Sequence, residues 1–313
     1  MNDGFARIFL EALSNAIDNF FRSQNTSTPL TKITVELDRE SGWTSIQNDG
    51  LHIPVEIHTE ENIYIPELIF GHLLSGSNLD DDEQRQTSGR NGLGIKLLNV
   101  FSQEFKISCF DPDRQLLYEQ RWTDHMKHCH KPKIRKKTST KGYTKLSWLP
   151  DFQLFGMTGY DDSHCSLYQR YLLDAGMITK IPVYWNDRKY HFKNLAAYVN
   201  LFPLEERKKC DGILNGSNFS IEYVICEQFL PLASISFVNG IYTKEGGIHV
   251  DRFSMELFRQ LAKKLSKLKN AKWKTKLPVL IRLLLLTVKR QHFVLLVYGM
   301  IYLSVFYHFQ NLN

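Results

Sequence analysis

Cysteines at the close, paired spacing of a disulfide framework or a metal site are absent from this sequence of 313 residues. Its five cysteines do not recur at short, regular intervals, and their odd number, with no signal-peptide pattern at the start, favours a reducing compartment. The stretch HMKHCH (125–130) gathers histidines around a cysteine, but no second pair of ligands follows at the spacing of a zinc site. We therefore do not predict zinc binding at this stretch.

An uninterrupted apolar run long enough to cross a membrane is also lacking. The most apolar stretch, LPVLIRLLLLTVKRQHFVLLVYGMIYLSVFYHF (277–309), is broken by Arg282, Lys289, Arg290 and His292. Neither half reaches the ~18–20 residues that span a bilayer, so we do not expect a membrane partner. We interpret the stretch as a buried strand or helix, or as an aberrant end of the reading frame. A hairpin or interfacial membrane segment is the alternative.

A strong excess of one charge sign is missing as well. The 39 basic and 33 acidic residues give a formal net charge of +6, which is compatible with a polyanionic partner without proving one. For the densest basic run, KPKIRKKTSTK (131–141), we predict a solvated loop, with a nucleic-acid contact as the alternative. The length and a hydrophobic content of 43% favour two domains.

Hydrophobic periodicity predicts a mixture of helices and strands. The first half holds a helix, a hairpin around the turn DRESG, a helix opened by Pro66, a long polar loop over 75–94, and several strands. A second module begins near residue 150. It is predicted to contain a helix over 164–178, a strand pair over 180–192, strands over 216–228 and 233–243, and a basic amphipathic helix over 249–269. Both modules mix the two element types, so the predicted fold class is α+β.

The first helix carries an unusual polar stripe within EALSNAIDNFF (11–21). At about 100° per residue, the polar stripe consists of Glu11, Asn15, Asp18 and Asn19. The apolar face on the opposite side of the helix consists of Phe9, Leu13, Ala16 and Phe20. Asparagine and aspartate are poor helix-interior residues because their short side chains compete for backbone hydrogen bonds. One interpretation is a solvated face. The other is a helix that lines a polar site with one carboxylate base and several amide ligands.

The stretch GRNGLGIK (89–96) is the most chemically suggestive loop. Its three glycines allow positive φ and let backbone N–H groups approach a phosphate chain, and Arg90 and Lys96 supply positive charge. The stretch lacks the Gly-Lys-Ser/Thr ending of a P-loop, and Leu97 stands where a dinucleotide fingerprint needs glycine. Taken alone, the loop leaves nucleotide binding and a structural turn both open.

Three segments, in order, resemble a known family. EALSNAIDN, PELIFGHLLSGSNLDDDEQRQTSGRNGLGIKLLNVFSQEF and FVNGIYTKEGGIHVD are similar to the ATPase and transducer regions of eukaryotic and large-DNA-virus type II DNA topoisomerases, which carry a Bergerat-type (GHKL) ATP site. The similarity runs from about residue 7 to about residue 275. It implies a GHKL helix–sheet sandwich over 1–148, a ribosomal-S5-like transducer over 149–276, and a truncated or diverged apolar tail over 277–313.

The resemblance also implies roles for individual residues. Glu11 is expected to be the general base that deprotonates the water attacking ATP, and Asn15 is expected to hold Mg²⁺ through its amide oxygen. The turn at 49–50 is expected beneath the adenine, the segment 76–78 at the ribose, and 89–96 around the phosphates. The cofactor-binding residues implied, besides Asn15, are Asp18, Asn19, Asn48, Asp49, Gly50, Gly76, Ser77, Asn78, Gly89, Arg90, Asn91, Gly92, Leu93, Gly94, Ile95 and Lys96.

Some positions depart from the family pattern. His52 stands where the family has the second glycine of the adenine turn, and Gly76 replaces a usual serine. We expect the family's exchanged amino-terminal arm to be missing, because the sequence starts almost at the first helix. No Gln-Thr-Lys occurs in the sequence, although in the family such a loop brings a lysine to the γ-phosphate. The DNA-cleavage half is also expected to be missing.

The resemblance thus implies the ATP-hydrolysing portion of a type II DNA topoisomerase, which drives strand passage in double-stranded DNA. An ATP-dependent homodimer is expected, alone or with a separately encoded cleavage subunit, in the nucleus if cellular, or in the host nucleus, cytoplasm or virion if viral. One alternative is a catalytically impaired nucleotide-binding or dimerisation fragment left by gene truncation. Another is a membrane-associated protein anchored by its apolar tail.

Overall fold

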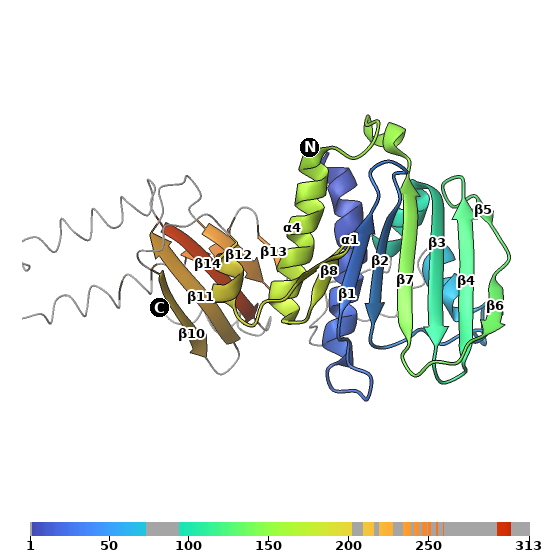
Figure 1. Cartoon of the computed structure of the whole chain (residues 1–313), viewed down its shortest axis with the longest axis horizontal. Helices are drawn as coiled ribbons and strands as arrows, with labels where there is room; N and C mark the ends of the chain where they lie inside the picture. Colours follow the sequence, from blue (N-terminus) through green and yellow to red (C-terminus); the bar gives the residue numbers. More distant parts are fainter. Residues whose placement is uncertain are drawn as a thin grey trace, which may run out of the picture. The chain divides into compact units, whose positions relative to one another are not determined.

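The chain forms two compact units, residues 1–193 and 194–313, each of which is described by itself. Figure 1 shows the elements of both in a computed structural model. The structure describes residues 2–72, 94–201, 209–215, 219–227, 234–238, 241–243, 246–248, 250–251, 255, 259 and 293–301.

In the described residues of the first unit, four helices accompany a large sheet. Its helices are α1 (Asp3–Ser23), α2 (Ile65–Gly71), α3 (Gly94–Val100) and α4 (Asp162–Thr179), with a 3-10 turn at Phe152–Phe155. Its strands are β1 (Ile33–Leu37), β2 (Thr44–Asp49), β3 (Ser102–Asp111), β4 (Leu116–Thr123), β5 (His128–Cys129), β6 (Lys133–Lys136), β7 (Tyr143–Pro150), β8 (Val183–Trp185) and β9 (Arg188–Tyr190).

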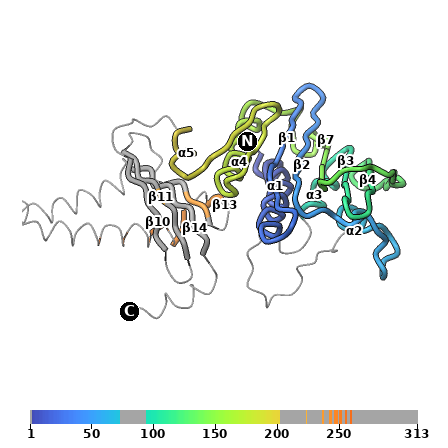
Figure 2. Tube along the Cα trace, turned by 60° about the horizontal axis from the view of Figure 1, so that its bottom comes forward, coloured from blue at the N-terminus to red at the C-terminus, as the bar shows by residue number. Residues whose placement is uncertain are grey.

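Among the described residues, these nine strands make one sheet in the order β5-β4-β3-β7-β2-β1-β8-β9, with β6 also paired to β4. The pairings are antiparallel except for the parallel pair β1–β8. The helices lie on one face of the sheet (Figures 1 and 2). Burial alternates along β7, as expected for an antiparallel sheet with one packed and one solvated face. The packed face positions the candidate site.

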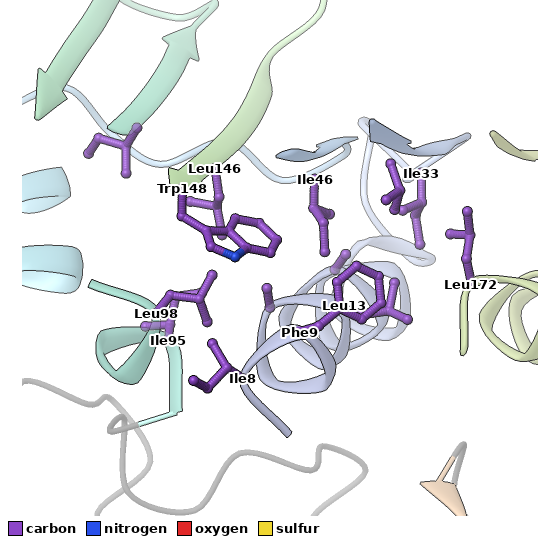
Figure 3. Packing of buried hydrophobic residues seen from close by; sticks show 14 of the residues in the cluster. Ile8, Phe9, Leu13, Ile33, Ile46, Ile95, Leu98, Leu146, Trp148 and Leu172 are labelled. Carbon is purple, nitrogen blue, oxygen red and sulfur yellow. The ribbon is translucent and has the colours of Figure 1, made fainter. Parts of the chain in front are cut away.

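Helix α1 lies at the centre of the packed layer (Figure 3). Its amino terminus is capped by Asn2, whose Oδ1 accepts a hydrogen bond of 3.0 Å from the backbone N–H of Phe5. Phe9 and Leu13 are fully buried, and the Phe9 ring stacks on Tyr168 of α4 with ring centroids 4.0 Å apart. The predicted apolar face of this helix is therefore confirmed. It anchors α1 against both the sheet and α4.

The predicted elements of the first unit are largely observed, with one correction. The run 131–141 was predicted as a solvated loop, but Lys133–Lys136 form β6, paired with β4. Only Ile134 of this strand is apolar, so the sequence shows no alternation; pairing of the backbone with β4 forms the strand instead. The compact unit runs on to Lys193 because α4 packs on α1 and β8 pairs with β1. The domain limits implied by the resemblance stay a prediction.

The second unit contains a separate sheet. The elements that the structure describes there are α5 (Leu195–Val199), β10 (Lys209–Asn215), β11 (Phe219–Glu227), β12 (Ser234–Val238), β13 (Ile241–Tyr242) and β14 (Phe293–Ile301). The strand order is β10-β11-β14-β12-β13, so β14 pairs antiparallel with β11 and parallel with β12. Of the interpretations of the apolar stretch 277–309, the structure shows a strand over 293–301. The predicted helix over 249–269 lies almost entirely outside the described residues.

A tight turn after β2 is joined to α1 through Asn19. The Asn19 Nδ2 group donates to the Leu51 carbonyl at 3.0 Å, and its Oδ1 accepts from the Leu51 N–H at 3.1 Å. Gly50, the residue before Leu51, has a φ of +116°, and a Cβ at this position would lie 2.8 Å from the Cβ of Leu30. Both the backbone conformation and the lack of space therefore require glycine at position 50.

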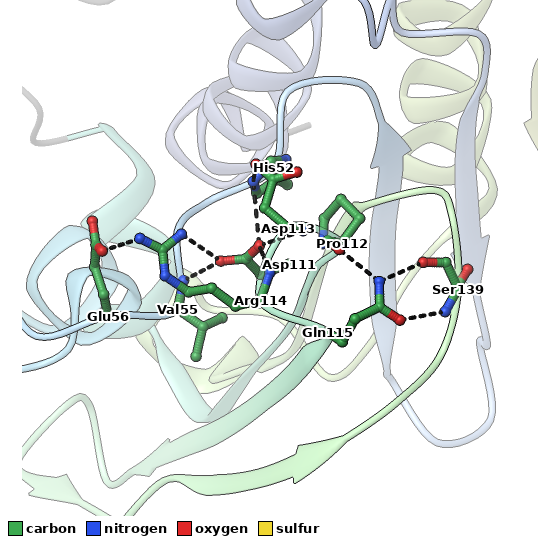
Figure 4. A network of polar contacts seen from close by, with 9 residues as sticks. All are labelled: His52, Val55, Glu56, Asp111, Pro112, Asp113, Arg114, Gln115 and Ser139. Atoms are coloured by element: carbon green, nitrogen blue, oxygen red, sulfur yellow. Dashed lines mark hydrogen bonds and ion pairs between the residues drawn. The ribbon is translucent and has the colours of Figure 1, made fainter.

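A second polar cluster holds the same loop to the turn between β3 and β4 (Figure 4). The fully buried Asp111 accepts hydrogen bonds from the N–H groups of Val55 and Arg114, and the Arg114 side chain pairs with both Asp111 and Glu56. His52 Nε2 lies 3.4 Å from Asp111 Oδ1. Burial alone would raise the pKa of Asp111, but the backbone hydrogen bonds and His52 lower it below its ordinary value of 3.8.

Replacing Gly50 by alanine is expected to lower the free energy of unfolding by about 1–3 kcal/mol, because alanine is strained at positive φ and would overlap Leu30. Urea denaturation followed by tryptophan fluorescence measures the loss, since four of the five tryptophans lie in the first unit. Gly159→Ala is the matched control. Nothing lies within 4 Å of a Cβ at residue 159, so a change within ~0.5 kcal/mol is expected there. Equal effects at both positions would contradict the turn analysis.

The Asp111 cluster predicts a pH-dependent stability. Because the pKa of Asp111 is lowered by folding, its ionised form stabilises the protein fully above pH 3.8, and this contribution is lost as the pH falls towards the folded-state value. Asp111→Asn should therefore destabilise the protein at neutral pH, and the difference from wild type should shrink below pH 3.8. Urea denaturation at several pH values measures this. Asp113→Asn, at a largely exposed carboxylate, is the control, and a difference independent of pH would refute the assignment.

Candidate functional site

The polar stripe of α1 divides into an accessible part and a buried part. Asn15 is exposed and Glu11 is 21% exposed, whereas Asp18 and Asn19 are buried. The side-chain amide of Asn15 donates to the backbone carbonyl of Glu11 at 2.7 Å. Its Oδ1 makes no hydrogen bond to the part of the chain that the structure describes. Glu11 and Asn15 are thus the members of the stripe that a ligand can reach.

The carboxylate of Glu11 is held from two sides. Arg7, one helical turn earlier, places its Nε and Nη2 atoms at 2.6 Å from Oε1 of Glu11. On the other side lies Gly94, the first residue of α3. A Cβ at Gly94 would overlap Oε2 of Glu11 and lie 2.8 Å from its Cδ. A side chain at residue 94 would displace this carboxylate, and the structure thus brings together two predicted site residues that are far apart in the sequence.

Helix α3 places its residues in the core of the first unit. Ile95 and Leu98 belong to the hydrophobic core, and Lys96 is only 1% exposed. Burial disfavours the charged ammonium and lowers the pKa of Lys96 below its ordinary value. A buried lysine at the end of a glycine-rich stretch is unusual, because lysine is rarely fully buried. The contact of Lys96 with an anionic ligand stays a prediction.

The turn residues predicted at the adenine have clear structural partners. Asn48 is buried, and its side-chain amide donates to the backbone carbonyl of Asp49 at 3.2 Å. The Asp49 carboxylate accepts hydrogen bonds from the N–H groups of Thr31 and Lys32 at 2.8 and 3.0 Å. Hydrogen bonds to other parts of the protein therefore hold the turn in place. Asp49 binds the backbone of Thr31 and Lys32, just before β1, and Asn19 binds the backbone of Leu51. Their expected contacts with a nucleotide stay predictions.

The remaining predicted site residues cannot be placed. They lie outside the described residues and comprise Gly76, Ser77, Asn78, Gly89, Arg90, Asn91, Gly92 and Leu93. The described part of the site is therefore the Glu11–Asn15 stretch of α1, the start of α3 at Gly94, and the turn at Asn48–Gly50.

Two places in the described residues could be considered for metal binding: the side chain of Asn15, and a group of three residues around Asp111. Mg²⁺ prefers oxygen ligands and usually takes only one or two from the protein when it accompanies a phosphate substrate. The exposed amide oxygen of Asn15 fits that requirement. Among the described residues, His52, Asp111 and Asp113 form the one group with a metal-like arrangement, but Asp111 already accepts hydrogen bonds from three backbone N–H groups. We assign that group to the structural cluster.

Arg7 is the functional neighbour that the sequence reasoning missed. The signal was present, because an Arg and a Glu four residues apart on a helix form an ion pair. Arg7 lies before the stretch 11–21, whose polar stripe was the basis for predicting site residues, so Arg7 was not included. The Arg7–Glu11 pair fixes one carboxylate oxygen and leaves the other facing Gly94.

Comparison with known proteins identifies the fold and the family. Residues 2–136 match the family model described as histidine kinase-, DNA gyrase B- and HSP90-like ATPase. The chain is 37% identical over 281 residues to DNA topoisomerase 2 of Invertebrate iridescent virus 6, covering 85% of the chain and 24% of that protein. It is 37% identical over 283 residues to DNA topoisomerase 2 of Saccharomyces cerevisiae, covering 85% of the chain and 20% of that protein. The chain thus spans about a fifth to a quarter of these relatives.

Solved structures agree. The ATPase region of Saccharomyces cerevisiae topoisomerase II superposes with a TM-score of 0.77 at 32% identity, over 96% of this chain and 73% of that one. The ATPase and transducer domains of DNA topoisomerase II from Balamuthia mandrillaris give a TM-score of 0.77 at 30% identity, over 94% and 72%. In the part of the chain that the structure describes, no helix has the length and apolarity to span a bilayer.

The α+β fold and the GHKL resemblance expected from the sequence are both confirmed by these matches. Residues 2–136 form the part that matches the histidine kinase-, DNA gyrase B- and HSP90-like ATPases, and the chain belongs to the family of type II DNA topoisomerase ATPase regions.

Proposed function

We propose that the chain binds ATP with Mg²⁺ and hydrolyses it, as the ATP-driven portion of an enzyme that changes DNA topology. The observation that carries this proposal is the position of Glu11, whose carboxylate lies against Gly94 at the end of the glycine-rich stretch. A base on a rigid helix, adjacent to a glycine-rich loop, is the arrangement that phosphoryl transfer to water requires. The match of residues 2–136 to the GHKL ATPases supports the choice of ATP.

The proposed chemistry gives each residue of α1 a separate task. Glu11 accepts the proton of a water molecule as the water oxygen attacks the γ-phosphorus and ADP leaves. Arg7 keeps the carboxylate oriented by binding Oε1. Asn15 would hold Mg²⁺ through Oδ1, and the bound ion would neutralise charge on the phosphates. Gly89–Lys96 would surround the phosphate chain, Asn48 would contact the nucleotide, and Asp49 and Gly50 would lie beneath the adenine.

The partners follow from the family and belong to the same proposal. The relatives are named DNA topoisomerase 2, so double-stranded DNA is the proposed substrate, an ATP-dependent homodimer the proposed assembly, and a separate cleavage subunit a further partner. A nuclear location is proposed for a cellular source, and the host nucleus, cytoplasm or virion for a viral one. A nucleotide-binding fragment with impaired catalysis is the second candidate, because the 313 residues contain no Gln-Thr-Lys.

Binding and chemistry are expected to separate in two variants of α1. Asn15→Ala should weaken binding of a non-hydrolysable ATP analogue in the presence of Mg²⁺, because it removes the metal ligand. Glu11→Gln should leave that binding largely intact, because it keeps the shape of the side chain and removes only the base. Isothermal titration calorimetry measures both. No heat and no shift in melting temperature with wild type at millimolar analogue would refute nucleotide binding.

Steady-state hydrolysis by a polypeptide of these 313 residues is expected to be close to background. Removing one group that stabilises charge in the transition state commonly costs roughly 10²–10³ in rate, about 3–4 kcal/mol, and the resemblance assigns that task to a Gln-Thr-Lys loop. A phosphate-release assay measures the rate. Appending a family-type segment that carries the loop should raise it. Ordinary turnover by the unmodified chain, abolished by Glu11→Gln, would instead show that another cation performs this task.

A further inference from the structure

The solvated face of the first sheet contains a basic hollow that no nucleotide-site residue lines. It has a volume of about 730 Å³ and is formed by β3, β4, β7 and the segment 130–133. Four of its lining side chains are cationic, namely Lys106, Arg121, Lys131 and Lys133, against the single carboxylate of Glu119. In Figure 1 strands β4, β3 and β7 lie side by side, and the helices cover the other face of the sheet they form. We name this feature the basic hollow.

The sheet register brings the cations of separate strands together. Lys106 of β3 is directly opposite Arg121 of β4, and on its other side it faces Ser147 of β7. Glu119 of β4 faces Lys133 of β6 in the same way. With strands ~4.8 Å apart, the floor from β7 to β6 is about 14 Å wide. A floor of this width can contact several phosphates of a DNA backbone.

The carboxylates near the hollow already have cationic partners. Glu119 pairs with Arg135 at 2.9 Å, and Oε1 of Glu104 lies 3.1 Å from Lys106 and 3.6 Å from Arg121. The Glu119–Arg135 pair is exposed, and pairs of this kind contribute little to stability, so a phosphate can compete for its cation. Lys106 and Arg121 share the single carboxylate of Glu104, so one of their two positive charges is left uncompensated by it. Lys131 and Lys133 make no ion pair with any described residue. The positive charges around the hollow therefore outnumber the carboxylates that pair with them.

The chemistry of the lining favours a duplex backbone over single-stranded nucleic acid. Proteins that bind single strands offer aromatic rings on which bases stack, whereas the lining of the hollow contains no Phe, Tyr or Trp and one His, His130. The nearby Trp43 ring is covered by Lys106, whose Nζ lies 4.0 Å from the ring centroid. Ser108 and Ser147 supply hydroxyl donors suited to phosphate oxygens.

We propose that the basic hollow binds the phosphate backbone of double-stranded DNA independently of sequence. The choice of DNA rests on the proposed function, but the surface is separate from the nucleotide site, which lies on the helix-covered face. The hollow thus gives the ATPase unit a DNA contact of its own. Strand β6, formed by part of the basic run 131–141, supplies one wall of it.

The test uses the full chain and the double variant Lys106→Gln/Arg121→Gln. Binding to a 30-base-pair duplex is measured by fluorescence anisotropy at several salt concentrations. Because each neutralised phosphate contributes ~0.9 to the slope of log affinity against log salt concentration, the slope should become shallower by about 1.8. The loss should be equal for duplexes of unrelated sequence. An unchanged melting temperature would show that the variant remains folded.

The matched control is Arg188→Gln/Lys189→Gln. It makes the same change of charge on exposed residues of β9, at the opposite end of the same sheet. An unaltered slope in this control supports the proposal. An equal change in both variants, tighter binding to single-stranded than to duplex DNA, or no measurable binding by wild type would each overturn it. Calorimetry with the ATP analogue on the same proteins tests the proposed function separately, since the hollow variants should keep nucleotide binding.

Discussion

The packing of α1 against the sheet is the constraint on which the candidate site depends. Phe9 and Leu13 are fully buried beneath the helix, and this fixes its rotation about its own axis. A fixed rotation leaves Glu11 and Asn15 at the edge of the packed layer, where a ligand can reach them. A base for hydrolysis must be held within a few tenths of an ångström, and a helix buried on one side provides this better than a loop. The stacking of Phe9 on Tyr168 secures it further.

The sequence predicted the elements that carry strong periodicity and missed those formed by pairing alone. The amphipathic pattern of α1 and the alternation in β7 identify both elements directly. Strand β6 has only one apolar residue, so the run 131–141 reads as a loop until β4 is present to pair with it. For the apolar stretch 277–309, the sequence left a buried strand and a buried helix both open. The strand over 293–301 pairs with β11 and β12, which are distant in the sequence, so its pairing could not be read from the stretch itself.

The site residues show the same limit. The type of side chain on α1 indicated a polar site, but it could not separate residues that face a ligand from residues that support the turn. Asn19 and Asp49 each satisfy backbone groups of a neighbouring loop, through Leu51 in one case and Thr31 and Lys32 in the other. Nothing in the residue types distinguishes this from ligand binding, because the same amide and carboxylate atoms serve both purposes. Only the three-dimensional partners reveal it.

Lys96 links the energetics of the fold to the proposed ligand. Taking an ammonium out of water disfavours its charged form, and its lowered pKa records that cost in the protein without ligand. A phosphate chain nearby would favour the charged form again. Under the proposed function, a polyphosphate in contact with Lys96 would restore the charged form, whereas a neutral ligand would gain nothing from this change. Burial of Lys96 would then favour an anionic ligand over a neutral one.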